Sequence, residues 1–207
     1  MRVKDIVLVG AGGHARSCID VIESLPEFRI IGLIGKSLEV GTEILGYEVL
    51  GVDDDLSRVS KYCKNGFITV GQIKNHATRS ELYSKLLDLG FDVPTFISPE
   101  AHVSKHSKID RGTIVMPGAI VMPGAQVGFN CIVNSRALIE HDVRVGSGCH
   151  ISTGVIVNGG TTIGPNSFVG SGTIIREGMN LESNSFIPMG SLVLKNDTKK
   201  DMDDFDV

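Results

Sequence analysis

The 207-residue chain lacks the features that mark several common functional classes. It has no tryptophan, only 5% aromatic residues and a net charge of −4, so neither a basic nucleic-acid footprint nor an aromatic stacking platform is visible. No stretch approaches the ~20 consecutive apolar residues of a membrane span. The N-terminal sequence runs into a glycine turn rather than a signal-peptide cleavage region. We therefore expect a cytoplasmic protein whose partners include neither nucleic acid nor a membrane.

Cysteine is also sparse, with four residues and no CxxC spacing. This pattern argues against a zinc ribbon and against a secreted disulfide framework, so we expect reduced thiols. Cys131 and Cys149 stand 18 residues apart at equivalent positions of a repeat described below. Small core-filling side chains are the common use of such cysteines, and a nucleophile is the alternative.

What the chain has instead is a strict six-residue period in its second half. Sixteen consecutive hexads carry an aliphatic residue at one position, and the residue two places earlier is Ala, Ser, Thr, Cys or Val in every hexad except the one with Met179. A short fixed period predicts a solenoid with one short strand and one turn per hexad and three hexads per coil. The inward-pointing aliphatic residues are Val103, Ile109, Val115, Val121, Val127, Val133, Ile139, Val145, Ile151, Val157, Ile163, Val169, Ile175, Leu181, Ile187 and Val193.

The first half of the chain has no such period and alternates strand-like with helix-like segments, which predicts a parallel sheet covered by helices. We therefore predict a Rossmann-like α/β domain over residues 1–95, a parallel β-helix domain over 96–194 and a charged tail over 195–207 that is mobile or a partial cap. The expected strands are 5–9, 29–34 and 66–71, with a hairpin or edge strand at 46–51, and the expected helices are 15–24, 53–61 and 78–89.

A glycine-rich turn, GAGGHA at residues 10–15, joins the first expected strand to the first helix. Backbone N–H groups at such a helix start can face an anion, and glycines allow a ligand to approach closely. Ala15 replaces the third glycine of the dinucleotide motif, and Gly35 and Lys36 follow the second strand where an acidic residue would stand, so an NAD site is disfavoured. A nucleotide or sugar-phosphate site and a tight turn without a ligand both stay open, with His14 binding a phosphate or capping the turn.

Three segments on one chain resemble the NeuD/PglD family of sugar acyltransferases: GAGGHA at 10–15, VGQIKNHATR at 70–79 and NSRALIEHD at 134–142. The resemblance covers nearly the whole chain. It implies left-handed winding of the β-helix, acetyl-CoA as co-substrate, a homotrimer with active sites between subunits, and acetylation of sugars for bacterial surface glycans. We expect N-acetylation of a nucleotide-linked amino sugar, with O-acetylation of a sialic acid as the alternative.

The resemblance also implies roles for individual residues. It places a catalytic base at His141 and its supporting acid at Asp142, where the family more often has Glu. Acetyl-CoA contacts fall on His150, Gly159 and Ser171, with the Gly159 N–H facing the acetyl carbonyl. The expected substrate-binding residues are Gly12, Gly13, His14, Ala15, Gly71 and Asn134.

Some features depart from the family pattern. Relatives that bind UDP-sugars carry acidic residues where this chain has Gly35 and Lys36, which weakens a uridine assignment. Ala15 replaces a more frequent glycine. The usual C-terminal signature is replaced by KNDTKKDMDDFDV at 195–207, so contacts to CoA from the last coil do not transfer.

The hexad register predicts the position of His141, and the resemblance implies its chemistry. His141 stands two residues after Ile139, so it projects outward near an edge of the β-helix. Asp142 is expected to turn back toward one imidazole nitrogen, with Glu140 as the competing partner, and such a contact raises the basicity of the other nitrogen. We expect direct transfer without an acyl-enzyme and with Gly159 N–H as the oxyanion donor.

Two other functions compete with acetyl transfer. A β-helix of this kind can carry zinc between subunits, but His102, His141 and His150 do not share one register, so no metal is expected. A sugar-nucleotide binder that has lost catalysis would also keep the fold. Substitution of His141 separates a binder from an enzyme.

Overall fold

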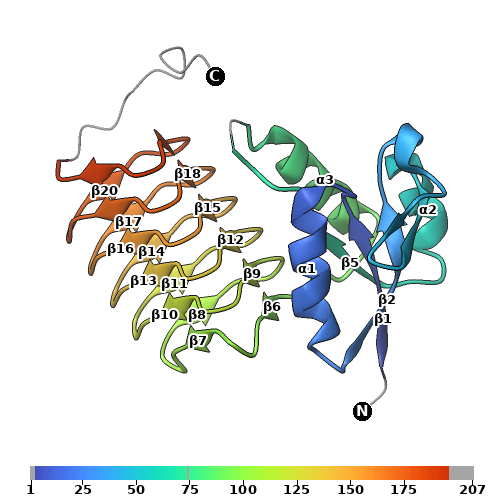
Figure 1. Ribbon diagram of the computed structural model, residues 1–207, viewed down its shortest axis with the longest axis horizontal. Helices are drawn as coiled ribbons and strands as arrows, with labels where there is room; N and C mark the ends of the chain where they lie inside the picture. Colours follow the sequence, from blue (N-terminus) through green and yellow to red (C-terminus); the bar gives the residue numbers. More distant parts are fainter. Residues whose placement is uncertain (1–2, 74, 196–207) are drawn as a thin grey trace. The chain divides into compact units, whose positions relative to one another are not determined.

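The computed structural model describes residues 3–73 and 75–195 (Figure 1). The chain divides into two compact units between Ser98 and Pro99. The predicted charged tail lies outside the described residues except for its first residue, Lys195.

The first unit is an α/β fold built on one sheet in the order β3-β4-β2-β1-β5. Strands β1, β2, β4 and β5 run parallel, and β3 pairs antiparallel with β4, so the segment at 46–51 is both a hairpin arm and a parallel neighbour of β2. The aliphatic residues of β1 are fully buried, as expected for a parallel strand covered on both faces. The strands are β1 (Lys4–Val9), β2 (Phe28–Ile34), β3 (Glu43–Ile44), β4 (Tyr47–Gly51) and β5 (Asn65–Ile68).

The helices of this unit follow the predicted order with shifted bounds. Helix α1 (Gly13–Glu23) begins two residues before the predicted start, because Gly12 is already in the N-cap position. The expected helix at 53–61 is a 3₁₀ turn, η2 (Asp53–Asp55), followed by a short α2 (Leu56–Val59). A second 3₁₀ turn, η1 (Ser37–Glu39), follows β2, and α3 (Ala77–Asp88) follows β5.

Strand β5 ends at Ile68, three residues before its predicted end. Beyond it, Thr69 Oγ1 donates a hydrogen bond of 2.6 Å to Gly10 O, and Thr69 N–H donates one of 2.8 Å to Val9 O. Segment 69–71 is therefore tied to the glycine turn after β1 instead of extending the sheet. At the end of the unit, β6 (Phe96–Ile97) places the Phe96 ring edge-to-face on Phe28 and Phe67.

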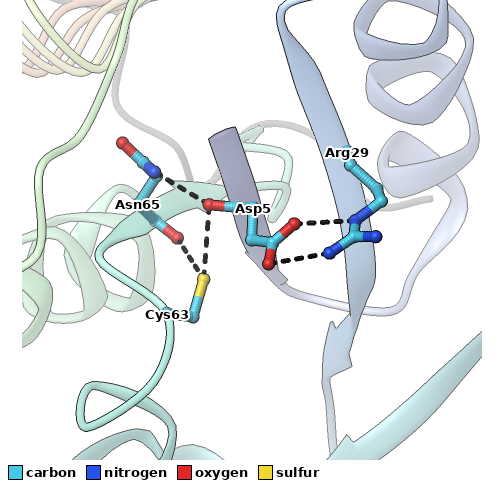
Figure 2. A network of polar contacts seen from close by, with 4 residues as sticks. All are labelled: Asp5, Arg29, Cys63 and Asn65. Carbon is cyan, nitrogen blue, oxygen red and sulfur yellow. Dashed lines mark hydrogen bonds and ion pairs between the residues drawn. The ribbon is translucent and has the colours of Figure 1, made fainter. Parts of the chain in front are cut away.

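A polar network joins β1, β2 and β5 near their amino ends (Figure 2). The Asp5 carboxylate accepts two hydrogen bonds from Arg29, of 2.7 and 3.0 Å, while Asp5 O accepts bonds from Asn65 Nδ2 and Cys63 Sγ. Ligands of parallel α/β sheets bind at the opposite, carboxyl ends of the strands. We assign this network a structural role.

The second unit is a three-sided parallel β-helix in which short strands stack coil upon coil (Figure 1). We name each sheet after one central strand. The β13 sheet contains β7 (His102–Val103), β10 (Ile120–Val121), β13 (Leu138–Ile139), β16 (Ile156–Val157), β19 (Ile174–Ile175) and β22 (Leu192–Val193). The β14 sheet contains β8 (Lys108–Ile109), β11 (Gln126–Val127), β14 (Arg144–Val145), β17 (Thr162–Ile163) and β20 (Asn180–Leu181). The strands of the second unit in the β15 sheet are β9 (Ile114–Val115), β12 (Ile132–Val133), β15 (His150–Ile151), β18 (Phe168–Val169) and β21 (Phe186–Ile187).

The 18-residue coil predicted from the hexads is the observed register. Ile139, for example, pairs with Val121 in the coil before it and with Val157 in the coil after it. The aliphatic residues are buried from Val115 to Val193, whereas Val103 and Ile109 of the first coil are half-buried. Each inward residue thus gains its burial from neighbouring coils, which is the energetic logic of a solenoid.

The corners between strands repeatedly use a left-handed backbone conformation. Glycine fills this position in most coils, for instance Gly124 and Gly160. Non-glycine residues with positive φ also occur there, namely Asn130, Arg136, Asp142, Asn166 and Asn184. Asn and Asp tolerate this conformation better than other side-chain-bearing residues, so Asp142 is placed where the backbone favours Gly, Asn or Asp.

Candidate functional site

His141 lies on an exposed corner between β13 and β14, as its register predicts. Its side chain is 65% exposed, and its Nδ1 atom lies 3.0 Å from Asp142 Oδ2. A carboxylate can only accept hydrogen bonds, so this contact places the proton on Nδ1 and leaves the Nε2 lone pair free to act as a base. Glu140, the competing partner, accepts a 3.2 Å bond from His141 N–H instead of contacting the ring.

Gly159 stands one coil away from His141, against its ring. A Cβ added at Gly159 would lie 2.6 Å from both Cε1 and Nε2 of His141. The same corner position carries a side chain in other coils, as in Pro123 and Glu177, and Gly159 has no positive φ. The backbone therefore does not require glycine here, and the close imidazole does.

The N–H of Gly159 has no hydrogen-bond partner in the described part of the chain. Its carbonyl accepts a bond from Gly178 N–H, which fixes the peptide within the stack of coils. A fixed donor beside the imidazole is the arrangement that an oxyanion requires. We call His141, Asp142 and Gly159 the His141 corner.

A second cluster of polar side chains lies at the corner where the chain passes from the β15 sheet to the β13 sheet. His150 Nε2 lies 3.1 Å from Asn134 Nδ2, and the His150 ring meets Phe168 edge-to-face at 5.3 Å. Ser171 Oγ lies 2.9 Å from Ser152 Oγ at the same corner. His150 is only 7% exposed in the single chain. We call Asn134, His150, Ser152 and Ser171 the His150 corner.

The two corners lie at opposite edges of the β13 sheet. Asn134 belongs to the turn that precedes β13, and His141 belongs to the turn that follows it. One chain therefore brings His141 together with Asp142 and Gly159, and brings Asn134 together with His150, but keeps these two groups apart.

The glycine turn of the first unit is open to a ligand. Gly12 and Gly13 are exposed, and a Cβ added at either would have no atom within 4 Å. Gly12 is the N-cap of α1 and has no side-chain capping bond. His14 is half-buried beside the turn, and Ala15 is fully buried in the helix core. Backbone N–H groups at this helix start are accessible to an anion.

Gly71 lies beside His14. A Cβ at this exposed residue would sit 3.4 Å from His14 Cβ, an ordinary contact. The segment before it is held by Arg79, whose buried Nη1 donates bonds of 2.9 and 2.8 Å to Ile68 O and Val70 O. The sequence did not single out Arg79, the last residue of the segment VGQIKNHATR, because sequence alone does not show that an arginine is buried.

Glu39 is a second residue that sequence reasoning missed. Its Oε2 accepts a 2.6 Å hydrogen bond from Lys36 N–H, and a Cβ at Gly35 would lie 2.7 Å from the same oxygen. The sequence shows no acid directly after β2, yet η1 folds one back to the end of that strand. The spacing of Gly35 and Glu39 was the available signal.

The paired cysteines of the β-helix are buried. Cys131 and Cys149 are at most 1% exposed, and Cys149 Sγ donates to Gly164 O at 3.2 Å. A hydrogen bond with the Cys131 thiol and burial raise the pKa of Cys149 well above its ordinary value. Because the reactive form of cysteine is the thiolate, this environment favours the core-filling interpretation over a nucleophile.

Two kinds of site are absent from the described residues. Within 3–73 and 75–195, no three His, Cys, Asp or Glu residues come together in an arrangement that could hold a metal ion. No helix in the same ranges is both long and apolar enough to cross a membrane.

Comparisons with known proteins agree with this architecture. Residues 5–86 match the model of the PglD N-terminal domain, and residues 160–195 match that of the hexapeptide repeat of succinyl-transferase. A comparison with curated protein sequences found no match.

Several solved structures resemble most of the chain, including two acetyltransferases. A mutant of perosamine N-acetyltransferase from Caulobacter crescentus, in complex with CoA and GDP-perosamine, is 25% identical with a TM-score of 0.87, over 94% of this chain and 90% of that one. The acetyltransferase domain of PglB from Neisseria gonorrhoeae, in complex with acetyl coenzyme A, is 26% identical with a TM-score of 0.83, over 92% and 93%.

These likenesses confirm the predicted fold class, an α/β unit followed by a left-handed β-helix of hexapeptide repeats. In sequence order, the chain has a PglD-type N-terminal domain followed by hexapeptide repeats of the acyltransferase kind. Both units of the chain therefore resemble the NeuD/PglD family of hexapeptide-repeat sugar acyltransferases.

Proposed function

We propose that this protein transfers the acetyl group of acetyl-CoA to the amino group of a nucleotide-linked sugar. The observation that carries the proposal is the His141–Asp142 pair. This pair is exposed on a corner of the β-helix, and Gly159 lies against the imidazole. The fold is shared with an N-acetyltransferase that binds CoA and GDP-perosamine, which supports the same reaction class here.

His141 acts as the general base in this proposal. Asp142 keeps Nδ1 protonated, so Nε2 takes the proton from the sugar amine as its nitrogen attacks the thioester carbonyl. The carbon–sulfur bond then breaks, and the imidazolium returns the proton to the departing sulfur of CoA. Atoms balance with an N-acetyl sugar and free CoA as products, and no acyl-enzyme is needed.

Gly159 N–H is the proposed donor to the oxyanion that forms on the acetyl carbonyl. It has no competing partner in residues 3–73 and 75–195. A fixed backbone donor of this kind typically contributes ~100- to 1000-fold in rate. The roles of His150, Gly159 and Ser171 in binding acetyl-CoA, and of Asn134 in lining the acceptor pocket, are part of this proposal.

The open glycine turn favours a phosphate-containing acceptor. Gly12 and Gly13 leave room at the start of α1, where a diphosphate would meet backbone N–H groups. A free sialic acid has no phosphate for this place. We therefore put N-acetylation of a nucleotide-linked amino sugar ahead of O-acetylation of a sialic acid.

The outer surface of the β13 sheet supports assembly into a homotrimer. From β10 onward, one aliphatic residue per coil points outward there, whereas β7 has His102 and the β14 sheet presents polar residues at the same positions. Leu192 is 67% exposed and Ile174 is 39% exposed in the single chain. The outward residues are Ile120, Leu138, Ile156, Ile174 and Leu192 on the β13 sheet, and Lys108, Gln126, Arg144, Thr162 and Asn180 on the β14 sheet.

A contiguous exposed apolar surface of this kind marks a protein interface. Because this sheet separates the His141 corner from the His150 corner, a second copy packed on it would bring the His141 corner of one subunit toward the His150 corner of the next. Ile156→Lys should dissociate the trimer on light-scattering chromatography, while Thr162→Lys on the polar sheet should not. A wild-type monomer would contradict the trimer proposal.

The reaction is tested by release of CoA thiol from acetyl-CoA. UDP-, GDP- and dTDP-linked amino sugars are compared with free and CMP-linked sialic acids, and products are identified by mass spectrometry. One amino sugar that gains an acetyl group is the expected result. Acetylation of a sialic acid alone would move the assignment to O-acetylation, and no turnover on any acceptor would leave a binding protein. We place the reaction in the cytoplasm, in keeping with four buried free cysteines.

A further inference from the structure

We propose that Glu39 determines nucleotide specificity by accepting a hydrogen bond from the ribose 2′-hydroxyl of the sugar nucleotide. This inference rests on the proposed function for the identity of the ligand. It predicts that ribonucleotide-linked sugars are preferred over 2′-deoxyribonucleotide-linked sugars such as dTDP-sugars.

The Glu39 carboxylate is held in place by one of its two oxygens. Oε2 accepts the 2.6 Å bond from Lys36 N–H, and Glu39 N–H donates a 2.8 Å bond to Lys36 O. The Thr42 hydroxyl donates a further 2.6 Å bond to Glu39 O. The side chain is half-buried, and Oε1 has no partner in the described part of the chain. One acceptor is therefore fixed in position and free.

This carboxylate stands beside the glycine turn. The point where a Gly35 Cβ would lie is 2.7 Å from Glu39 Oε2 and 3.0 Å from Ala11 Cβ. Gly10 N–H donates a 2.8 Å bond to Ile34 O, which joins the ends of β1 and β2 directly. The acceptor and the exposed helix start thus share the carboxyl edge of two adjacent parallel strands.

That edge is where α/β sheets bind nucleotides, with phosphates at the helix start and an acidic residue on the ribose. An ionised carboxylate only accepts hydrogen bonds, and a ribose 2′-hydroxyl donates one. The ribose follows directly on the phosphates, so the adjacent strand end is within its reach. Lys36 is exposed beside the same carboxylate and does not form an ion pair with it.

Asp55 shows what the same turn looks like without this free acceptor. Its Oδ2 accepts a 2.9 Å bond from Val52 N–H after β4, and a Cβ at Gly51 would collide with it, as Gly35 would with Glu39. Its other oxygen, Oδ1, accepts a 3.4 Å bond from Arg58. The strand it follows is separated from β1 by β2. Asp55 is therefore a matched structural control.

The test is binding of four probes to the full chain by calorimetry: GDP, 2′-deoxy-GDP, UDP and 2′-deoxy-UDP. The wild type should bind each ribonucleotide about 10- to 100-fold more tightly than its deoxy form, the usual range for a hydrogen bond to a charged group. Glu39→Gln keeps a carbonyl for Lys36 N–H but replaces the free oxygen with a donor, so this preference should fall to near one.

Two further variants sharpen the test. Gly35→Ala would place a methyl group against Glu39 Oε2 and should also abolish the preference. Asp55→Asn should leave it unchanged. Equal binding of ribo and deoxy forms by the wild type, or a preference that survives in Glu39→Gln, would overturn the inference. If Glu39→Gln weakened the binding of GDP and of 2′-deoxy-GDP equally and left UDP binding unchanged, Glu39 would contact the base instead of the ribose. That result would also overturn the inference.

Failure of this inference is separable from failure of the proposed function. The probes carry no amino sugar, and binding needs no acetyl transfer. Acetyl transfer without ribose preference would remove only the role of Glu39. Ribose preference without transfer to any acceptor would keep that role and remove the enzyme.

Discussion

Two histidines of the β-helix, His141 and His150, stand nine residues apart in sequence and in opposite environments. His141 is 65% exposed, paired with a carboxylate and set against a glycine. His150 is 7% exposed, with Asn134 at its Nε2 and Phe168 against its ring. An imidazole that must exchange protons with a substrate needs a free nitrogen, and the described contacts leave one at His141. The place of a histidine in the coil decides whether its imidazole is exposed or buried.

Loss of the His141 imidazole should have the largest effect on turnover. His141→Ala should lower kcat/KM by roughly 100- to 10,000-fold, the usual contribution of a general base. The melting temperature should stay close to that of the wild type because the side chain is exposed. Thiol release and thermal denaturation measure the two effects. Undiminished turnover would remove the proposed base.

Crowding His141 without removing it should have the next largest effect. Gly159→Ala places a methyl group 2.6 Å from the ring and forces it to move. A displacement of about 1 Å in a catalytic group costs roughly 100-fold in rate. Glu177→Ala, at the same corner position one coil further on, is the control and should retain full activity. Equal rates for both variants would show that the imidazole position is not critical.

The partner of His141 should matter less than the imidazole itself. Asp142→Asn keeps a residue suited to positive φ, as Asn130, Asn166 and Asn184 show in this chain. It removes the acceptor that fixes the proton on Nδ1, so kcat should fall by roughly 10- to 100-fold, a part of what the base contributes. Stability should be retained, and an unchanged kcat would return the supporting role to Glu140.

Substitution of His150 should act first on stability. His150→Ala removes a buried ring from Phe168 and leaves Asn134 without this partner, for a loss of about 1 to 3 kcal/mol in the free energy of unfolding. Chemical denaturation measures this loss. The KM for acetyl-CoA should rise if the ring also contacts the co-substrate. A variant as stable as the wild type would show that the buried His150, like the exposed His141, contributes little to stability.

The smallest effect is expected for the cysteines. Burial raises the pKa of Cys18 to about 12. The neighbouring Cys131 thiol and burial also raise the pKa of Cys149. Iodoacetamide at pH 8 should therefore leave the native protein unmodified by mass spectrometry and fully active. Rapid alkylation of Cys149 together with loss of turnover would revive the nucleophile alternative.

Much of the fold could be predicted from local pattern. The hexad series predicts the coil length, the inward residues and the outward direction of His141, because every coil repeats the same geometry. Most strands of the first unit were also placed, apart from the end of β5 and the short β3 (Glu43–Ile44), which was not predicted. That end depends on Thr69 reaching Gly10, a contact between residues 59 positions apart, which no local pattern contains.

The candidate sites likewise contain features that local pattern predicts and features that depend on distant contacts. Register places His150 and Arg144 equally on the outside of their strands, yet one is buried and the other exposed. The difference comes from Asn134 and Phe168, which stand in other coils. Likewise, the sequence shows no acid directly after β2, and the turn η1 brings Glu39 back to the end of that strand.

The sequence by itself determined the coil of the β-helix, the corner of His141 and the glycine turn, because each depends on residues close together in the chain. Tertiary structure decided which histidine is buried, that Gly159 touches an imidazole 18 residues earlier, and that a carboxylate stands beside the glycine turn. These features depend on contacts between distant segments. Such contacts form only when the whole fold brings the segments together.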